Sequence, residues 1–538
     1  MIALSGRAIS AARHAFRPTS PPSGTGVRLK QGGMAIKAKN RRPGRARRTA
    51  RWLFSPGETL SSRTVNAGVW NFALSLSGRL LRTIRTVVIA RFLAPEDLGL
   101  MGIALLALNL IETFTNTGFR QALIQREGDI GDHLNAAWTI QVLRGLVLGG
   151  ALLLAAPLVA AFFEAPEAVA IVRWLALVIV LAGLTNIGVV YFDKELQYRE
   201  RYLFRSIPQV ADLIASAAAA AILRNVWALV IGLVAGTVVR LVASYVAHPY
   251  RPRLSSDWHK AGELFKFGIW VFGSSMLVYL MLHLDDIVVG KVLSPGDLGY
   301  YQLAYTISAL VATEITSVVT QVAFPAMSKV QNDLPRLRRG YLRALQLVAV
   351  VVFPFAAGLW FVGPQAVEVF LGSRWIPLIA AYEVLVLWGL IRSLGSTTNP
   401  LFQAVGKPYI VTGIQLATVL ILAAAIYPLT INGGIAGAAW ATVIAAAPFV
   451  ASLFLVSRLL ELPRTAIPSL LAVPAGVTGI MLAVLLLIKG ISPALAGPWL
   501  LLWSPVVGIV VYGVGLIGAR RFLGYAPQGF LPQLGGRQ

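Results

Sequence analysis

The sequence predicts an all-α protein that crosses a membrane about fourteen times. Hydrophobic residues make up 57% of the 538-residue chain and charged residues only 13%, whereas an average soluble protein is about 25% charged. Apolar runs of about 20 residues, long enough to span a bilayer, recur from residue 64 onward. A stretch near the first of these runs also returns 200 residues later. These observations exclude a water-soluble fold and predict two related halves.

The repeat joins residues 68–104 to residues 268–304, where 12 of the 37 ungapped positions are identical. The shared residues include Pro95, Asp97 and Gly99, each matched by the same residue 200 positions later. So many identities in one register predict two homologous sets of six helices with the same orientation. Two parallel repeats that face each other across a midplane cavity are typical of a transporter.

Residues 1–60 are predicted to form a disordered, basic cytoplasmic tail, because they are rich in Arg, Gly, Ser and Pro and have no apolar periodicity. Thirteen Lys and Arg precede residue 52, and the first acidic residue is Glu58. A solvated topology anchor is the simplest interpretation, and binding to anionic membrane lipids is the alternative. A start at Met34 would instead leave residues 1–33 untranslated.

The rest of the chain divides into an N-terminal six-helix lobe at 61–255, a C-terminal six-helix lobe at 256–460, two further transmembrane helices at 461–525 and a cytoplasmic tail at 526–538. At 1.5 Å per residue, each predicted helix spans roughly 30 Å of hydrocarbon or nearly so. The fifth and sixth are rich in Ala, Gly and Ser, which lets neighbouring helices approach closely. The fourteen segments run at 64–90, 98–119, 135–163, 167–191, 206–223, 226–247, 264–290, 298–325, 341–363, 376–396, 408–429, 433–457, 466–488 and 497–519.

The distribution of basic residues among the predicted loops sets the orientation. With the N-terminus in the cytoplasm, twenty Lys and Arg fall in inner loops or at the C-terminal end, and five fall in outer loops. This strong positive-inside bias predicts that both termini are cytoplasmic and that the loops at 91–97 and 291–297 lie outside. A miscounted helix would swap the two sets partway along the chain, and no such swap occurs.

Enzyme, cofactor and metal chemistry are not expected. The chain has no cysteine, its five histidines lack metal-binding spacing, and no Walker-type glycine loop precedes a Lys-Ser or Lys-Thr pair. No predicted loop much exceeds 20 residues, so no catalytic domain protrudes. The net charge of +24 resides in the tail and in short loops, which argues against a nucleic-acid partner.

Charged residues inside the predicted helices are the best functional signal, because they are costly there and usually face a cavity or a partner. Arg79, Arg82 and Arg85 are spaced to line one side of the first helix. The matching part of the seventh helix carries an acidic group instead. That group contains His283, Asp285 and Asp286, and the offset of 200 aligns Arg85 with Asp285. Further cavity candidates are Glu112, Asp212, Glu314, Glu383 and Arg392.

Several motifs resemble the polysaccharide-transport, Wzx-type flippases of the MATE-like multidrug/oligosaccharidyl-lipid/polysaccharide exporter superfamily. They are ARFLAPEDLGLMGIA at 90–104 with its echo at 290–304, GFRQALIQR at 118–126, FPAMSKVQNDLPRLRRGYLRAL at 324–345 and FQAVGKP at 402–408. The resemblance implies a V-shaped pair of six-helix lobes in the bacterial inner membrane. It also implies transport of an undecaprenyl-diphosphate-linked oligosaccharide to the outer leaflet, with ion-coupled antiport. The long basic tail departs from the family pattern.

The predicted function is therefore a flippase for lipid-linked oligosaccharide in exopolysaccharide, capsule or O-antigen assembly. Arg79, Arg82 and Arg85 are the candidates for binding the diphosphate headgroup, because the arginine fork matches phosphate oxygens. His283, Asp285 and Asp286 are the ion-coupling candidates. A polysaccharide polymerase and glycosyltransferases of the same pathway are the expected protein partners. The alternatives are a MATE-type ion-coupled drug or metabolite antiporter and a membrane-embedded polysaccharide polymerase or transferase.

Overall fold

A computed structural model describes residues 77–114, 123, 130–195, 197–255, 276–491 and 497–523. These residues form helices and short connections, with no strand among them, so the predicted all-α class is confirmed for this part of the chain. The predicted tails at 1–60 and 526–538 lie outside the described residues.

The first half of the described chain, which we call the N-half, ends at residue 255. Asp97 helps to begin its helix α4, because the carboxylate accepts a 3.0 Å hydrogen bond from the amide of Ala94. Asn186 separates the later elements, since its side chain caps the short helix η1 and the chain bends by 71° there. The helices of the N-half are 77–92, α4 (Pro95–Phe114), α6 (Gly131–Phe162), α7 (Ala168–Gly183), η1 (Ile187–Val189), α8 (Val190–Lys194), α9 (Tyr198–Leu223) and α10 (Trp227–Ala247).

Residues 276–460 form the C-half. Its helix α12 begins with a complete capping box, in which Ser294 and Asp297 satisfy each other's backbone amides. Gly434 has a positive φ of 56° and interrupts α16 close to the break predicted between the segments 408–429 and 433–457. The helices are 276–292, α12 (Pro295–Lys329), α13 (Leu334–Ala366), η2 (Val367–Leu371), η3 (Ser373–Leu378), α14 (Ile379–Ser396), α15 (Thr398–Ala404), α16 (Pro408–Ala445) and α17 (Ala447–Leu459).

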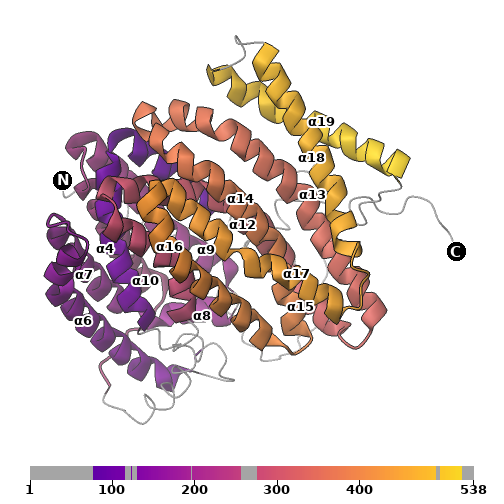
Figure 1. Cartoon of the computed structure of the whole chain (residues 1–538). Coiled ribbons are helices and arrows are strands. Elements are labelled where there is room, and N and C mark those ends of the chain that lie inside the picture. Colours follow the sequence, from indigo (N-terminus) through magenta and orange to yellow (C-terminus); the bar gives the residue numbers. More distant parts are fainter. Residues whose placement is uncertain are drawn as a thin grey trace, which may run out of the picture.

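Three further helical segments follow, α18 (Ala466–Ile491), η5 (Gly497–Trp499) and α19 (Leu500–Leu523). Helices α18 and α19 pack against each other and against α13, at the edge of the C-half (Figure 1). The hydroxyl of Tyr512 donates to the carbonyl of Val350 at 2.8 Å in this contact. Within the described part of the chain, the main contacts of the last two helices are therefore with the C-half.

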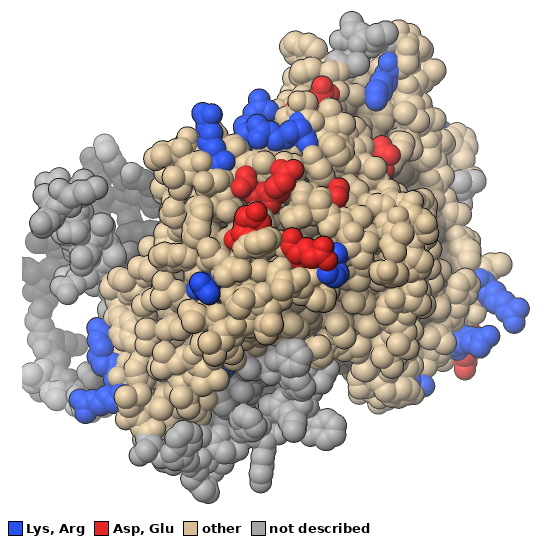
Figure 2. Space-filling model, turned by 60° about the vertical axis from the view of Figure 1, so that its left-hand side comes forward, with Lys and Arg blue, Asp and Glu red and all other residues tan. Residues whose placement is uncertain are grey.

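Eight helices of the described chain are long and apolar enough to cross a membrane, or nine if the bent α7–α8 pair is one span. Large apolar side chains face outward on these helices, as at Leu154, Ile222 and Ile509, which are 75%, 80% and 74% exposed. Figure 2 shows a wide uncharged surface, with carboxylates gathered in one group and Lys and Arg around it. Such a surface fits hydrocarbon, and the chain is a multi-pass membrane protein. The finer count of fourteen helices in two parallel repeats stays a prediction.

The two halves are joined mainly through α4 and α12, which pack against each other. One buried apolar cluster contains side chains of both halves, among them Ile103 and Leu106 of α4 and Leu298 of α12. The N-half helices lie on the indigo and purple side of the molecule, and the orange helices of the C-half lie beside them (Figure 1). The α4–α12 contact therefore brings the repeated motifs of the two halves together.

Candidate functional site

The three arginines predicted to line one side of the first helix, Arg79, Arg82 and Arg85, lie on the helix 77–92 of the N-half. We call them the basic row. Arg82 is exposed, whereas Arg79 and Arg85 are half-buried. The Nε atom of Arg85 forms an ion pair with Asp212 Oδ2 of α9 at 3.0 Å. One of the three predicted headgroup residues therefore already has a carboxylate partner.

The carboxylate of Asp212 is held in place by close packing of α9 against α10. A methyl group on Gly232 would lie 2.5 Å from Asp212 Oδ1, and one on Gly236 would lie 3.0 Å from Asp212 Cβ. Both distances are shorter than ordinary van der Waals contact, so a larger residue at either position would require Asp212 or its neighbours to shift. The small residues predicted to bring these helices together thus also make room for the carboxylate.

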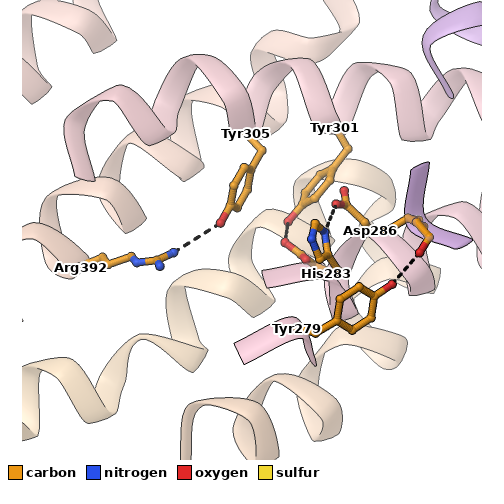
Figure 3. Close-up of polar contacts among 8 residues, drawn as sticks. Tyr279, His283, Asp286, Tyr301, Tyr305 and Arg392 are labelled. Carbon is orange, nitrogen blue, oxygen red and sulfur yellow. Dashed lines mark hydrogen bonds and ion pairs between the residues drawn. The ribbon is translucent and has the colours of Figure 1, made fainter. Parts of the chain in front are cut away.

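The acidic group lies in the C-half, on the helix 276–292, and its most buried member is Asp285 at 2% exposure. The hydroxyl of Tyr301, labelled in Figure 3, donates to Asp285 Oδ2 at 2.8 Å. It also lies 3.0 Å from the Thr442 hydroxyl. The other carboxylate oxygen, Oδ1, is buried and has no hydrogen-bond partner. A buried carboxylate with one empty acceptor can bind a proton or a small cation at that oxygen.

The neighbouring Asp286 has different partners. Its Oδ2 atom lies 3.4 Å from Nδ1 of His283 (Figure 3). The side chain of Gln302 also hydrogen-bonds to Asp286. The ring of Tyr279 lies 4.9 Å from the His283 ring, and its hydroxyl donates to the carbonyl of Leu106 in the N-half at 2.9 Å. The predicted grouping of His283 with Asp286 is thus present, and a hydrogen bond connects its surroundings to α4.

A second polar group extends from Tyr301 along α12. Tyr305 lies one turn further on, with its ring 6.5 Å from the Tyr301 ring. An Arg392 guanidinium nitrogen from α14 lies 3.4 Å from the Tyr305 hydroxyl (Figure 3). The guanidinium also lies over the ring of Trp388, 5.0 Å from its centroid. The predicted cavity residue Arg392 therefore belongs to an aromatic group next to the acidic one.

The remaining predicted residues lie apart from these groups. Arg144 of α6 donates to the backbone carbonyl of Glu112 at 3.1 Å, and Arg144 and Arg240 are the cations that act on the Glu112 carboxylate. Glu383 is half-buried on α14 beside Tyr382. Glu314 is on α12, and its side chain is outside the described part of the structure.

Sequence reasoning did not identify the aromatic and hydroxyl partners of the acidic group. Tyr301 and Tyr305 are spaced i and i+4 on a predicted helix, which was the available signal for a polar face. The sequence offered no such signal for Thr442. The described residues contain no group of three or more His, Cys, Asp or Glu that could hold a metal ion.

An ion pair at the end of these helices joins the two halves. Lys291 Nζ lies 2.8 Å from Glu164 Oε1, and this hydrogen bond together with the ammonium charge lowers the pKa of Glu164 from its ordinary value. Lys291 also lies 5.5 Å from the ring of Phe162. Lys291 is in the last turn of the helix 276–292, Phe162 is the last residue of α6, and Glu164 is in the connection that follows α6.

Comparison with known proteins gives consistent matches. The family described as polysaccharide biosynthesis protein matches residues 88–380. The lipopolysaccharide biosynthesis protein WzxC of Escherichia coli (strain K12) is 24% identical over 348 residues, which are 64% of this chain and 71% of that protein. The succinoglycan biosynthesis transport protein ExoT of Rhizobium meliloti (strain 1021) is 23% identical over 350 residues, 65% of this chain and 71% of that protein.

Two solved structures show the same fold. The lipid II flippase MurJ in an inward closed conformation gives a TM-score of 0.68 at 17% identity, over 86% of this chain and 100% of that one. An inward-facing multidrug resistance transporter of the MATE family gives a TM-score of 0.55 at 17% identity, over 70% and 94% of the two chains. The predicted MATE-like fold is thus supported by structures of transporters.

Proposed function

This chain belongs to the polysaccharide biosynthesis protein family, and on that premise we propose that it is a flippase. It moves a polyprenyl-diphosphate-linked oligosaccharide across the bacterial inner membrane for exopolysaccharide, capsule or O-antigen synthesis. The names of its relatives, a lipopolysaccharide biosynthesis protein and a succinoglycan transport protein, support this substrate class. A fold like that of a lipid II flippase supports the transport of a lipid-linked substrate.

The row of arginines on the helix 77–92 is the observation that carries the proposal. A diphosphate headgroup cannot enter a low-dielectric region without fixed cations to replace its water. Because Asp212 neutralises Arg85, the headgroup is contacted first by Arg82, which is exposed, and by its neighbour Arg79. The guanidinium fork then binds the phosphate oxygens in pairs.

The alternative functions predict different phenotypes. A drug antiporter of the MATE type handles cations, which the positive charge of the basic row would disfavour. A polymerase or transferase requires a catalytic centre, and the relatives are transport proteins instead. A null strain should therefore lose surface polysaccharide and keep its drug resistance. The opposite pattern would favour the antiporter.

The test of the headgroup site is polysaccharide export by a null strain complemented at matched membrane abundance. A hydrogen bond to a charged group contributes about 1.5–3 kcal/mol, so Arg82→Ala should reduce flipping by roughly 10- to 150-fold. Arg82→Lys should reduce it less, because lysine keeps the charge and loses only the fork. Arg173→Ala is the matched control, since this exposed arginine lies on α7 outside the basic row. Normal export by both Arg79→Ala and Arg82→Ala would remove the basic row from the mechanism.

The acidic group is proposed to couple flipping to an ion gradient. Asp285 has a buried oxygen with no hydrogen-bond partner, which is suited to a proton or a sodium ion. His283 and Asp286 lie beside it and can change charge with it. A fixed salt bridge from this group to an arginine of the first helix is the alternative role. In the structure, Arg85 pairs with Asp212, and Asp285 accepts a hydrogen bond from Tyr301.

The proposed setting is the inner membrane with both termini in the cytoplasm, and with lobes at 61–255 and 256–460. Because the chain has no cysteine, single cysteines at Glu96 and Gly296 report on the loops at 91–97 and 291–297. They should react with an impermeant thiol reagent in intact cells. A reaction confined to inverted vesicles would reverse the orientation. Anionic lipids, a polymerase and glycosyltransferases of the same pathway are the proposed partners.

A further inference from the structure

The helices α4 and α12 begin with a reciprocal backbone contact. A methyl group on Gly99 would overlap the carbonyl oxygen of Pro295 and lie 2.5 Å from its carbonyl carbon. A methyl group on Gly299 would in turn overlap the carbonyl oxygen of Pro95 and lie 2.9 Å from its carbonyl carbon. Carbon atoms normally keep about 3.5–4.0 Å apart, so only glycine permits this approach. The contact uses residues that the 200-residue repeat shares.

A second contact between the halves lies beside the first. The Trp375 indole nitrogen, in the η3 segment of the C-half, donates to the carbonyl of Ala90 at 2.8 Å, and both groups are buried. A guanidinium nitrogen of Arg374 donates to the carbonyl of Leu93 at 3.3 Å. These carbonyls belong to the C-terminal end of the helix 77–92, where a helix leaves its last carbonyls without partners. The C-half therefore caps the first helix of the N-half.

Further contacts between the halves lie at the same end or a few turns further along α4. The Glu164–Lys291 ion pair crosses the halves at 2.8 Å, and a methyl group on Gly290 would lie 3.1 Å from the ring of Phe163. Tyr279 donates to the carbonyl of Leu106 further along α4. Gly290 and Lys291 lie at or next to the connection predicted to face outside at 291–297, and Phe163 and Glu164 lie in the connection after α6.

We propose that these contacts form the outer gate of the transporter, and that Gly99 and Gly299 are the residues that set its closure. These contacts hold the two halves together at this end of the structure. They break, and the halves move apart there, when the headgroup passes to the outer leaflet. This inference rests on the proposed transport function and on the predicted orientation. At the start of α4 and α12 the two halves meet through glycines and backbone carbonyls, and the side chains of Trp375 and Arg374 add contacts beside them.

The glycine contacts of the gate lie close to the acidic group, because residues of α12 take part in both. Gln302, which hydrogen-bonds to Asp286, has its side chain against α4, where a methyl group on Gly102 would lie 2.8 Å from Gln302 Cδ. Gly299 and Tyr301 are two residues apart on α12, and Tyr301 holds Asp285. Movement of α12 away from α4 therefore disturbs the partners of both carboxylates. Ion binding and gate opening share these side chains.

The first experiment measures opening without any substrate. Ile103 is fully buried between the halves, so Ile103→Cys serves as a reporter for a thiol reagent added from outside. Gly99→Ala should open the gate and raise the rate of labelling by about tenfold or more. Gly150→Ala is the matched control, because it is also a helical glycine of the N-half and its methyl group would meet nothing within 4 Å. The control should label like the parent.

Labelling that stays at the parent rate in both Gly99→Ala and Gly299→Ala, with both proteins monodisperse, would overturn the gate. A second test does not require the protein to fold with an added methyl group at Gly99 or Gly299. A methyl group on Gly296 would lie 3.5 Å from Glu96 Cγ, so a Glu96→Cys, Gly296→Cys pair should form a disulfide in membranes under mild oxidation. Absence of this crosslink would also overturn the closed gate. Faster labelling in Gly99→Ala together with unchanged polysaccharide in the null strain would leave the gate standing and refute the proposed substrate.

Discussion

Trp375→Phe is the substitution whose effect on the gate can be estimated most directly. The indole of Trp375 is fully buried and donates to the carbonyl of Ala90, 285 residues earlier in the chain. In a continuing helix that carbonyl would accept from the amide of Ala94, but this amide donates to Asp97 at 3.0 Å. Phenylalanine keeps most of the ring and removes the donor, so a buried carbonyl loses the indole partner.

The size of the effect follows from the type of bond. A neutral hydrogen bond contributes about 0.5–1.5 kcal/mol, and a buried group left without a partner costs about 1–3 kcal/mol. Hydrogen bonds between membrane helices average about 0.6 kcal/mol, which favours the lower part of these ranges. We expect a loss of about 1–2 kcal/mol. Because the bond crosses the two halves, the loss falls on the closed state alone and shifts the closed-to-open ratio by roughly 5- to 30-fold.

The assay is labelling of the Ile103→Cys reporter from the outside, with and without Trp375→Phe. Trp499→Phe is the control, because this tryptophan is 64% exposed on η5. Labelling should become faster by the expected factor only for Trp375→Phe. An unchanged rate at normal thermal stability would mean that the cap on the first helix does not hold the gate closed.

Asp212→Asn removes the 3.0 Å ion pair with Arg85, and because both side chains are about three-quarters buried, we expect the free energy of unfolding to fall by roughly 1–3 kcal/mol. A double-mutant cycle with Arg85→Met measures this, and a coupling energy near zero would show that the pair is not formed in the membrane. Asp285→Asn and Tyr301→Phe should each weaken the dependence of flipping on the ion gradient, since they change the buried carboxylate or remove its donor. Full dependence in both variants, measured in proteoliposomes, would refute the coupling role. Burial, and then the charge of a nearby arginine, lower the pKa of His248 in the connection after α10. The unfolded chain then takes up a proton first, so this contribution to stability is present above about pH 6.5 and declines as the pH falls towards the lowered pKa. His248→Asn should flatten that part of a thermal-unfolding profile, and an unchanged pH profile would contradict it.

The membrane character of this protein is fixed by local properties of the sequence. Apolar runs, basic loops and the position of charges within a helix depend on neighbouring residues only, and the structure bears out helices long enough to cross a bilayer. The capping of α12 by Ser294 and Asp297 is equally local, because the partners are three residues apart. The match at 200 residues also identified Pro95 and Gly99 as special, although it did not say why.

Only the tertiary structure decided which charges meet. Arg79, Arg82 and Arg85 share one face of the predicted first helix, and only the packing of α9 against α10 showed that Asp212 forms an ion pair with Arg85. The tertiary structure likewise brought the Tyr301 hydroxyl to Asp285 and the Trp375 indole to the C-terminal end of the helix 77–92. These partners lie on different helices, and hydrophobic patterns do not specify how helices rotate and cross. The side chains that fit at each crossing settle this, here through glycines that permit carbonyl contacts and carboxylates that need a donor.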